Sequence, residues 1–120
     1  MKILIYETRA DELEAIHKLG KELPIEIQTT SEIPSMENVS MAEGCDGISI
    51  LGQGRIDGPF LEALAKYNVH YISTRTIGYN HIDLEYAEKL GIHVCNANYA
   101  PNGIADFTIM MMLMCLRQYK

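Results

Sequence analysis

Short apolar runs rich in β-branched residues alternate along this chain with longer amphipathic segments. The apolar runs have the length of single strands and are bounded by turn residues, which is typical of buried parallel strands. They predict strands at Lys2–Tyr6, Ile25–Thr29, Gly47–Leu51, Val69–Ser73 and Ile92–Cys95. Helical periodicity between these runs predicts helices at Asp11–Leu23, Met36–Gly44, Pro59–Tyr67 and Asp83–Leu90.

Strands that alternate with crossover helices favour one fold class, because each helix carries the chain back so that the next strand runs parallel. We therefore predict an α/β fold: a flavodoxin-like, doubly wound, five-stranded parallel sheet in a three-layer α/β/α arrangement. Helix start and stop signals agree with these boundaries, since Pro59 lies in a first turn and Gly91 directly follows Leu90.

The segment after the fifth strand follows a different pattern. Ile104–Leu116 is apolar almost all round, yet it is shorter than the roughly 20 residues that cross a bilayer. A helix of this kind needs partners on several sides, so we expect another domain or subunit to cover what one small domain leaves open. We interpret Met110–Met114 as core filler rather than as a cofactor site.

Composition narrows the function classes. A chain of 120 residues builds one domain with a real core, and 48% hydrophobic and 22% charged residues are ordinary for a globular protein. The net charge of −6 argues against nonspecific binding to nucleic acid or to an anionic membrane. A small anionic substrate stays open, because a local group of backbone N–H donors can outweigh the global charge.

Three cysteines, Cys45, Cys95 and Cys115, lack the spacing of a zinc site or a redox pair. Each lies in or beside an apolar segment, so we expect buried, reduced thiols. The apolar run at the N-terminus is too short for a signal peptide. A cytoplasmic location follows as the default expectation.

The stretch Tyr71–Asp83 reads as a buried strand, a glycine-bearing loop and a helix start. Backbone N–H groups at such a junction can hold a small carboxylate. Gly78 suits close approach of a ligand to the backbone, although it also suits a tight turn. We interpret His81 as a solvated residue at the helix start. The other three histidines have no acid or serine partner at a readable spacing, so no catalytic triad assembles.

The loop after the third predicted strand, Leu51–Gly58, nearly matches a dinucleotide-binding fingerprint. Asp57 occupies the place of the third glycine and would repel a pyrophosphate, so we reject this function. A response-regulator receiver is also rejected, because Glu7 is a lone acid after the first strand and Asn96 stands where a lysine is required.

Together with Asn96–Asn102, the Tyr71–Asp83 stretch resembles the N-terminal substrate (catalytic) domain of the D-2-hydroxyacid dehydrogenase family. The likeness is closest to D-lactate dehydrogenases of the vancomycin-resistance type, with Ala100 in place of the usual serine and Asp106 in place of the commoner glutamate.

The resemblance implies roles for individual residues. Ile77 and Gly78 would donate backbone N–H groups to the substrate carboxylate. Tyr99 would face the cleft, with a packing role as the alternative, and Leu51 would lie near the substrate side chain and favour a small group such as a methyl. Arg75 would fix its loop through structural hydrogen bonds, for instance to Asp83, rather than hold substrate. Asn102 would cap the following helix.

The resemblance also implies that different parts of the enzyme bind substrate and cofactor. Residues 1–103 would be the substrate-binding domain, and residues 104–120 an apolar interdomain helix that leads to a dinucleotide-binding domain not included here. That second domain would hold NAD and the catalytic arginine, glutamate and histidine, so we expect no catalytic residue in this chain and no turnover by it alone. The complete enzyme would be a homodimer acting on D-lactate and pyruvate.

The alternative is a stand-alone, non-catalytic module that binds a small acid or oligomerises. Its motivation is the apolar Ile104–Leu116 segment, through which two copies could pair or swap.

Overall fold

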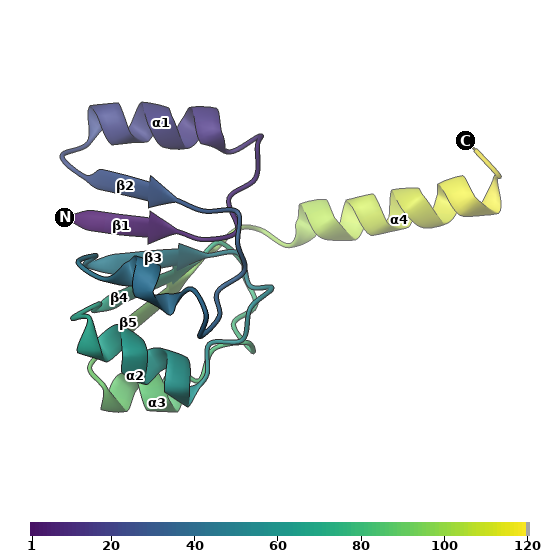
Figure 1. Ribbon diagram of the computed structural model, residues 1–120. Coiled ribbons are helices and arrows are strands. Elements are labelled where there is room, and N and C mark those ends of the chain that lie inside the picture. Colours follow the sequence, from purple (N-terminus) through teal and green to yellow (C-terminus); the bar gives the residue numbers. More distant parts are fainter. Residues whose placement is uncertain (120) are drawn as a thin grey trace.

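Five parallel strands form one sheet in the computed structural model, which describes residues 1–119 (Figure 1). The order across the sheet is β2-β1-β3-β4-β5, and the register aligns Ile3 with Gly47 and Ile48 with Ile72. This confirms the predicted five-stranded parallel α/β fold. The strands are β1 (Lys2–Ile5), β2 (Glu26–Thr29), β3 (Gly47–Ile50), β4 (Tyr71–Thr74) and β5 (His93–Asn96).

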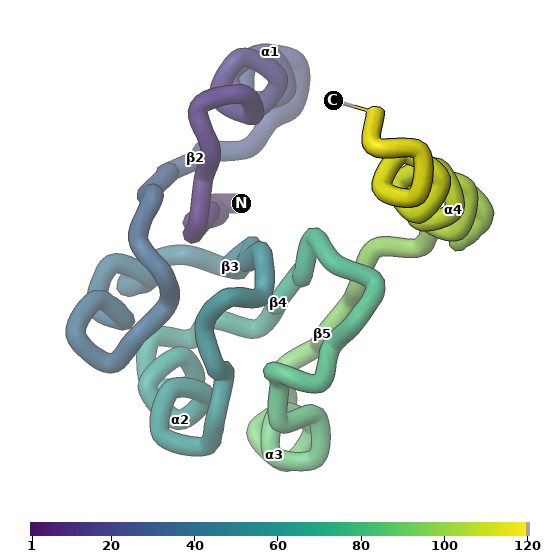
Figure 2. The backbone as a smooth tube through the Cα atoms, turned by 90° about the vertical axis from the view of Figure 1, so that its right-hand side faces the viewer, coloured from purple at the N-terminus to yellow at the C-terminus, as the bar shows by residue number. Residues whose placement is uncertain are grey.

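Helices cover the two faces of the sheet unequally. The helix α1 (Leu13–Glu22) lies on one side of the strands, while α2 (Gly58–Lys66) and α3 (Leu84–Lys89) lie on the other (Figure 2). Aspartate caps start both of the latter helices: Asp57 accepts from the Phe60 N–H at 3.4 Å, and Asp83 accepts from the Tyr86 N–H at 3.0 Å. The core lies mainly between the sheet and the layer that contains α2. Its largest apolar members include Leu4, Tyr6, Ile48, Ile50, Phe60, Leu61, Leu64 and Ile72.

The predicted helix Met36–Gly44 is wrong, since only a 3-10 turn, η1 (Val39–Ala42), forms there. Asn38 explains the difference, because its side chain accepts from the Ser35 N–H at 3.0 Å and donates to the Ile33 carbonyl at 2.9 Å. Such side-chain bonds to the local backbone compete with helix formation.

On the side of the sheet where α1 lies, no helix of residues 1–119 covers β3, β4 and β5. A groove of about 510 Å³ runs along this face, and Tyr71 and His93 stack there with ring centroids 5.7 Å apart. Cys95 lines the same groove and is exposed. Of the three free thiols only Cys45 is buried, so the prediction of buried thiols is wrong for Cys95, on the uncovered face, and for Cys115, on a projecting helix.

That projecting helix is α4 (Asn102–Leu116), which extends away from the sheet (Figure 1). None of its residues is buried against the rest of residues 1–119, and Phe107 is 58% exposed. The predicted cap is wrong, because Asn102 lies inside the helix and Pro101 holds the N-cap position without a side-chain bond. No helix in residues 1–119 is long and apolar enough to cross a membrane. The division into residues 1–103 and 104–120 stays a prediction, and Lys120 lies outside the described residues.

Candidate functional site

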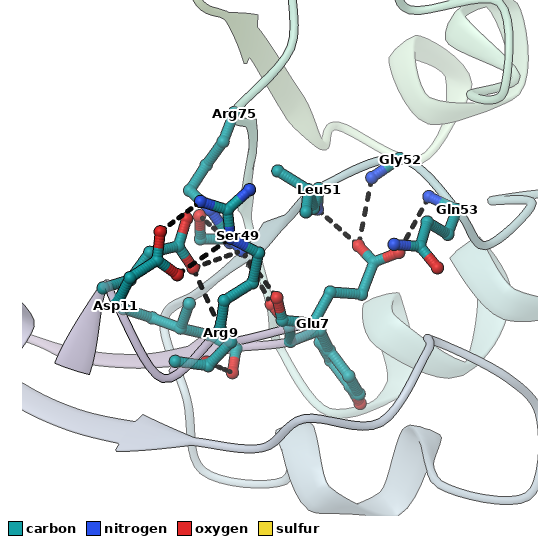
Figure 3. A network of polar contacts seen from close by, with 12 residues as sticks. Glu7, Arg9, Asp11, Ser49, Leu51, Gly52, Gln53 and Arg75 are labelled. Carbon is teal, nitrogen blue, oxygen red and sulfur yellow. Dashed lines mark hydrogen bonds and ion pairs between the residues drawn. The ribbon is translucent and has the colours of Figure 1, made fainter. Parts of the chain in front are cut away.

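The loops that follow β1, β3, β4 and β5 meet at the carboxyl edge of the sheet, where open parallel sheets bind their ligands. Three of these loops contain predicted site residues, and Tyr99 lies in the loop after β5. The loop after β3 begins with Leu51, and the loop after β4 contains Ile77 and Gly78. The turn after β1 contacts two of these loops. The Glu7 carboxylate binds N–H groups of the loop after β3, and Arg75, at the start of the loop after β4, donates to the Glu7 carbonyl (Figure 3).

The loop 76–78 is held through its side chains and carbonyl groups. The Thr76 hydroxyl donates to the Gly78 carbonyl at 2.7 Å, and the Asn96 side-chain amide donates to the Ile77 carbonyl at 2.8 Å. The Thr76 carbonyl accepts from the Ala97 N–H at 3.0 Å. These bonds fix the loop without using its own N–H donors.

The N–H groups of Ile77 and Gly78 donate to no other residue within 1–119. Both residues are exposed, and a Cβ added at Gly78 would meet no atom within 4 Å. Two adjacent backbone donors on a fixed loop suit a small anion, as the sequence predicts. That a ligand binds them stays a prediction.

Arg75 ties the turn after β1 to the loop after β4. One guanidinium nitrogen, Nη2, donates to the Tyr6 carbonyl at 3.1 Å and to the Glu7 carbonyl at 3.2 Å, while Nη1 donates to the Ser49 hydroxyl at 3.2 Å. The Glu12 carboxylate lies 3.5 Å from Nη2. The contacts are structural, as predicted, but the expected partner Asp83 is wrong because Asp83 caps α3.

Glu7 is the residue that sequence reasoning missed. It is only 4% exposed, and its carboxylate accepts from the Leu51 N–H, from the Gly52 N–H at 3.0 Å and from the Gln53 N–H at 2.7 Å (Figure 3). The one available signal was a carboxylate directly after an apolar strand. Nothing in the sequence shows that its partners lie more than forty residues further along the chain.

The loop after β3 is therefore unsuited to a dinucleotide. Its N–H donors already bind the Glu7 carboxylate, which would repel a pyrophosphate, and Asp57 stands at the N-cap of α2. His81 packs against this loop: a Cβ at Gly52 would lie 3.1 Å from the imidazole Cε1. The prediction of a solvated His81 is wrong, since the residue is half-buried in this contact.

The remaining predicted site residues are Leu51 and Tyr99. Leu51 is half-buried where β3 ends, next to the Glu7 carboxylate. Tyr99 is 52% exposed between β5 and α4 and forms no side-chain hydrogen bond within residues 1–119. Its place in a cleft stays a prediction.

Two buried groups have perturbed acidity. Burial raises the pKa of the Tyr6 hydroxyl, which donates to the Asn38 carbonyl at 3.0 Å, to about 12. Burial also raises the pKa of the Cys45 thiol. No group of three metal-ligating side chains occurs in residues 1–119.

This chain is similar to proteins of a known family. The profile of a family described as D-isomer specific 2-hydroxyacid dehydrogenase, catalytic domain, matches residues 3–111. A D-specific alpha-keto acid dehydrogenase of Enterococcus faecalis is 37% identical over 120 residues, which is 100% of this chain and 37% of that protein.

Solved structures agree. The apo-structure of D-lactate dehydrogenase from Escherichia coli matches with a TM-score of 0.84 and 28% identity, over 95% of this chain and 36% of that one. An NAD complex of a D-isomer specific 2-hydroxyacid dehydrogenase from Lactobacillus delbrueckii ssp. bulgaricus matches with a TM-score of 0.81 and 29% identity, over 98% of this chain and 36% of that one. The chain thus spans little more than a third of the length of these relatives.

Proposed function

The chain belongs to the D-isomer specific 2-hydroxyacid dehydrogenase family, and on that premise we propose that it forms the substrate-binding part of an NAD-dependent oxidoreductase. The proposed substrates are small D-2-hydroxy acids and their keto forms, with D-lactate and pyruvate foremost. The observation that carries the proposal is the pair of open N–H donors at Ile77 and Gly78. Residues 1–103 would form the substrate domain, and residues 104–120 would lead to a dinucleotide-binding domain.

In this proposal the substrate carboxylate accepts hydrogen bonds from the Ile77 and Gly78 N–H groups. Leu51 follows β3 at the same edge and would limit the space for the substrate side chain, which favours a methyl group. Tyr99 would close the cleft from the segment before α4. Exchanging Leu51 for alanine should then shift the preference from pyruvate towards larger keto acids by about tenfold.

NAD and the groups that transfer hydride and proton would belong to the part of the enzyme beyond these residues. The loop after β3 supports placing the NAD site elsewhere, because its N–H groups already donate to the Glu7 carboxylate and are not free for a pyrophosphate. The chain alone should not oxidise NADH with pyruvate. Turnover above background by the purified chain would overturn this part of the proposal.

Binding is tested by calorimetry with pyruvate and with acetone, which keeps the ketone but lacks the carboxylate. We expect weak but saturable binding of pyruvate only, because the charged group supplies the strongest hydrogen bonds. We expect Gly78→Ala to weaken this binding, because the added methyl group takes up space at the proposed site that is otherwise open. Equal heats from acetone and pyruvate would contradict a carboxylate site.

A second candidate function is an oligomerising module, which the exposed apolar surface of α4 favours. Two copies could bury Phe107, Leu113 and their neighbours, and the proposed dehydrogenase would be a homodimer. Sedimentation equilibrium distinguishes the cases: a chain that stays monomeric at high concentration counts against pairing through α4. The free thiols support a reducing compartment, and we propose the cytoplasm.

A further inference from the structure

Glu7 combines burial with an unfavourable backbone conformation. Its φ of 54° lies in the left-handed region, which a residue with a Cβ rarely adopts. Within residues 1–119, Glu7 and Thr74 are the two buried polar residues. A carboxylate needs strong compensation to be stable in such a place.

The compensation comes from consecutive N–H groups of one loop. Leu51, Gly52 and Gln53 all donate to the Glu7 carboxylate (Figure 3). Gly52 has a φ of 97°, which turns neighbouring N–H groups towards a common point. This is the geometry of a backbone anion-binding nest. Here the anion is part of the chain.

The backbone of Glu7 is held independently of its carboxylate. Its N–H donates to the Glu32 carbonyl at 3.1 Å, and its carbonyl accepts from Arg75 at 3.2 Å. Arg75 directly precedes the loop 76–78. Glu7 therefore lies between two loops, one bound through its side chain and the other through the arginine that contacts its carbonyl.

We propose that Glu7 is a positioning residue whose carboxylate is the built-in anion of the loop 51–53. By occupying the nest it sets the shape of that loop and the place of Leu51 at the carboxyl edge. The inference rests on the proposed function only for the role of Leu51 beside a substrate. Removing the side chain leaves a site for a free small carboxylate, for which formate is the probe.

The test compares Glu7→Gly with the native chain, both labelled with ¹⁵N. Glycine tolerates the left-handed backbone, so this variant removes the carboxylate without adding backbone strain. We expect the amide resonances of Leu51, Gly52 and Gln53 to move on mutation and to return towards native positions as formate is added. The formate-induced changes in the chemical shifts of these amides should be about tenfold larger than in the native chain, because formate restores the charged hydrogen bonds.

Glu7→Gln is the matched control, since its amide fills the nest without charge and should make these resonances insensitive to formate. Chloride at equal ionic strength controls for salt. The proposal is overturned if formate leaves the loop 51–53 of Glu7→Gly unchanged, or if it acts equally on the glutamine variant.

A measurement on the native chain keeps the proposal testable if the glycine variant does not fold. Scalar coupling across the hydrogen bond between the Gln53 amide nitrogen and the Glu7 carboxyl carbon should be detectable, and its absence would refute the contact. Pyruvate titration of the native chain reports separately on Ile77 and Gly78. Failure there would remove the proposed substrate site while leaving the role of Glu7 in shaping its loop intact.

Discussion

Two neighbouring loops at the carboxyl edge of the sheet use their backbone donors in opposite ways. The loop 51–53 gives its N–H groups to the buried Glu7 carboxylate, whereas Ile77 and Gly78 donate to no other residue within 1–119. Both loops follow parallel strands of the same sheet. The fold alone therefore does not decide which loop is open to a ligand.

The difference lies in a single side chain that comes from another strand. Glu7 reaches the loop after β3 from the end of β1, whereas no carboxylate in residues 1–119 accepts from the N–H groups of Ile77 or Gly78. Arg75, which stands between the two loops, instead binds carbonyl groups of the β1 turn. Donors that are already bonded stabilise their loop, whereas open donors are available to the proposed ligand. Substitutions in Glu7, Arg75 and the two loops test this difference.

Removing the internal anion should have the largest effect on stability. Glu7→Ala leaves three N–H groups without their charged acceptor, and we expect a loss of about 3–4 kcal/mol in the free energy of unfolding. Glu7→Gly should lose about 1 kcal/mol less, because glycine relieves the left-handed backbone. Urea unfolding measures both, and an alanine variant as stable as the native chain would show that the nest needs no anion.

Arg75→Lys should cost about 2 kcal/mol, because one ammonium group cannot reach both carbonyls and the Ser49 hydroxyl. Arg9→Lys is the control: Arg9 pairs with Asp11 on the exposed surface, and its exchange should leave the unfolding midpoint unchanged. If both variants unfold alike, Arg75 does not hold the β1 turn.

The pH dependence of stability tests the burial of Tyr6, the residue directly before Glu7. The pKa of Tyr6 is about 12 in the folded chain, against an ordinary value of 10.0. Below pH 10 the hydroxyl keeps its proton in both states; between these values the unfolded chain loses it first, so stability falls as pH rises. The loss should be on the order of 2 kcal/mol. Tyr6→Phe should flatten stability curves measured across this range, and an unchanged slope would exclude Tyr6 as its cause.

Alanine substitutions at Gly52 and Gly78 should have the smallest effects on stability. Gly52→Ala places a Cβ 3.1 Å from His81 at a φ of 97°, and we expect a loss of about 1–2 kcal/mol. Gly78→Ala meets open space and should stay within about 0.5 kcal/mol of the native chain. Thermal unfolding of the two variants compares the loops directly. Equal losses would mean that the loop 76–78 is as constrained as its neighbour.

The fold could be predicted because its signals are local. The apolar runs at Lys2–Tyr6 and Gly47–Leu51 became β1 and β3 with one residue trimmed from each. The helix expected at Met36–Gly44 failed for an equally local reason, since the Asn38 side chain hydrogen-bonds the backbone of Ser35 and Ile33, just before that segment, and so favours a turn there. Periodicity detects an amphipathic face but not this competition.

The site was harder to predict because its contacts join distant segments. Gly78 and Ile77 could be selected from their strand–loop–helix context and from family resemblance. Glu7 could not, since its partners Leu51 and Gly52 lie on a different strand end. The exposed position of Cys95 was missed in the same way, because an apolar strand does not reveal which of its faces a helix covers.

The most direct test follows the amide resonances of both loops while pyruvate is added to the native chain. We predict saturable shifts at Ile77 and Gly78, with little change at Leu51, Gly52 and Gln53, whose donors are already engaged by Glu7. Unperturbed Ile77 and Gly78 resonances at saturating pyruvate, or shifts of similar size in both loops, would contradict the distinction between an open and an internally filled anion site.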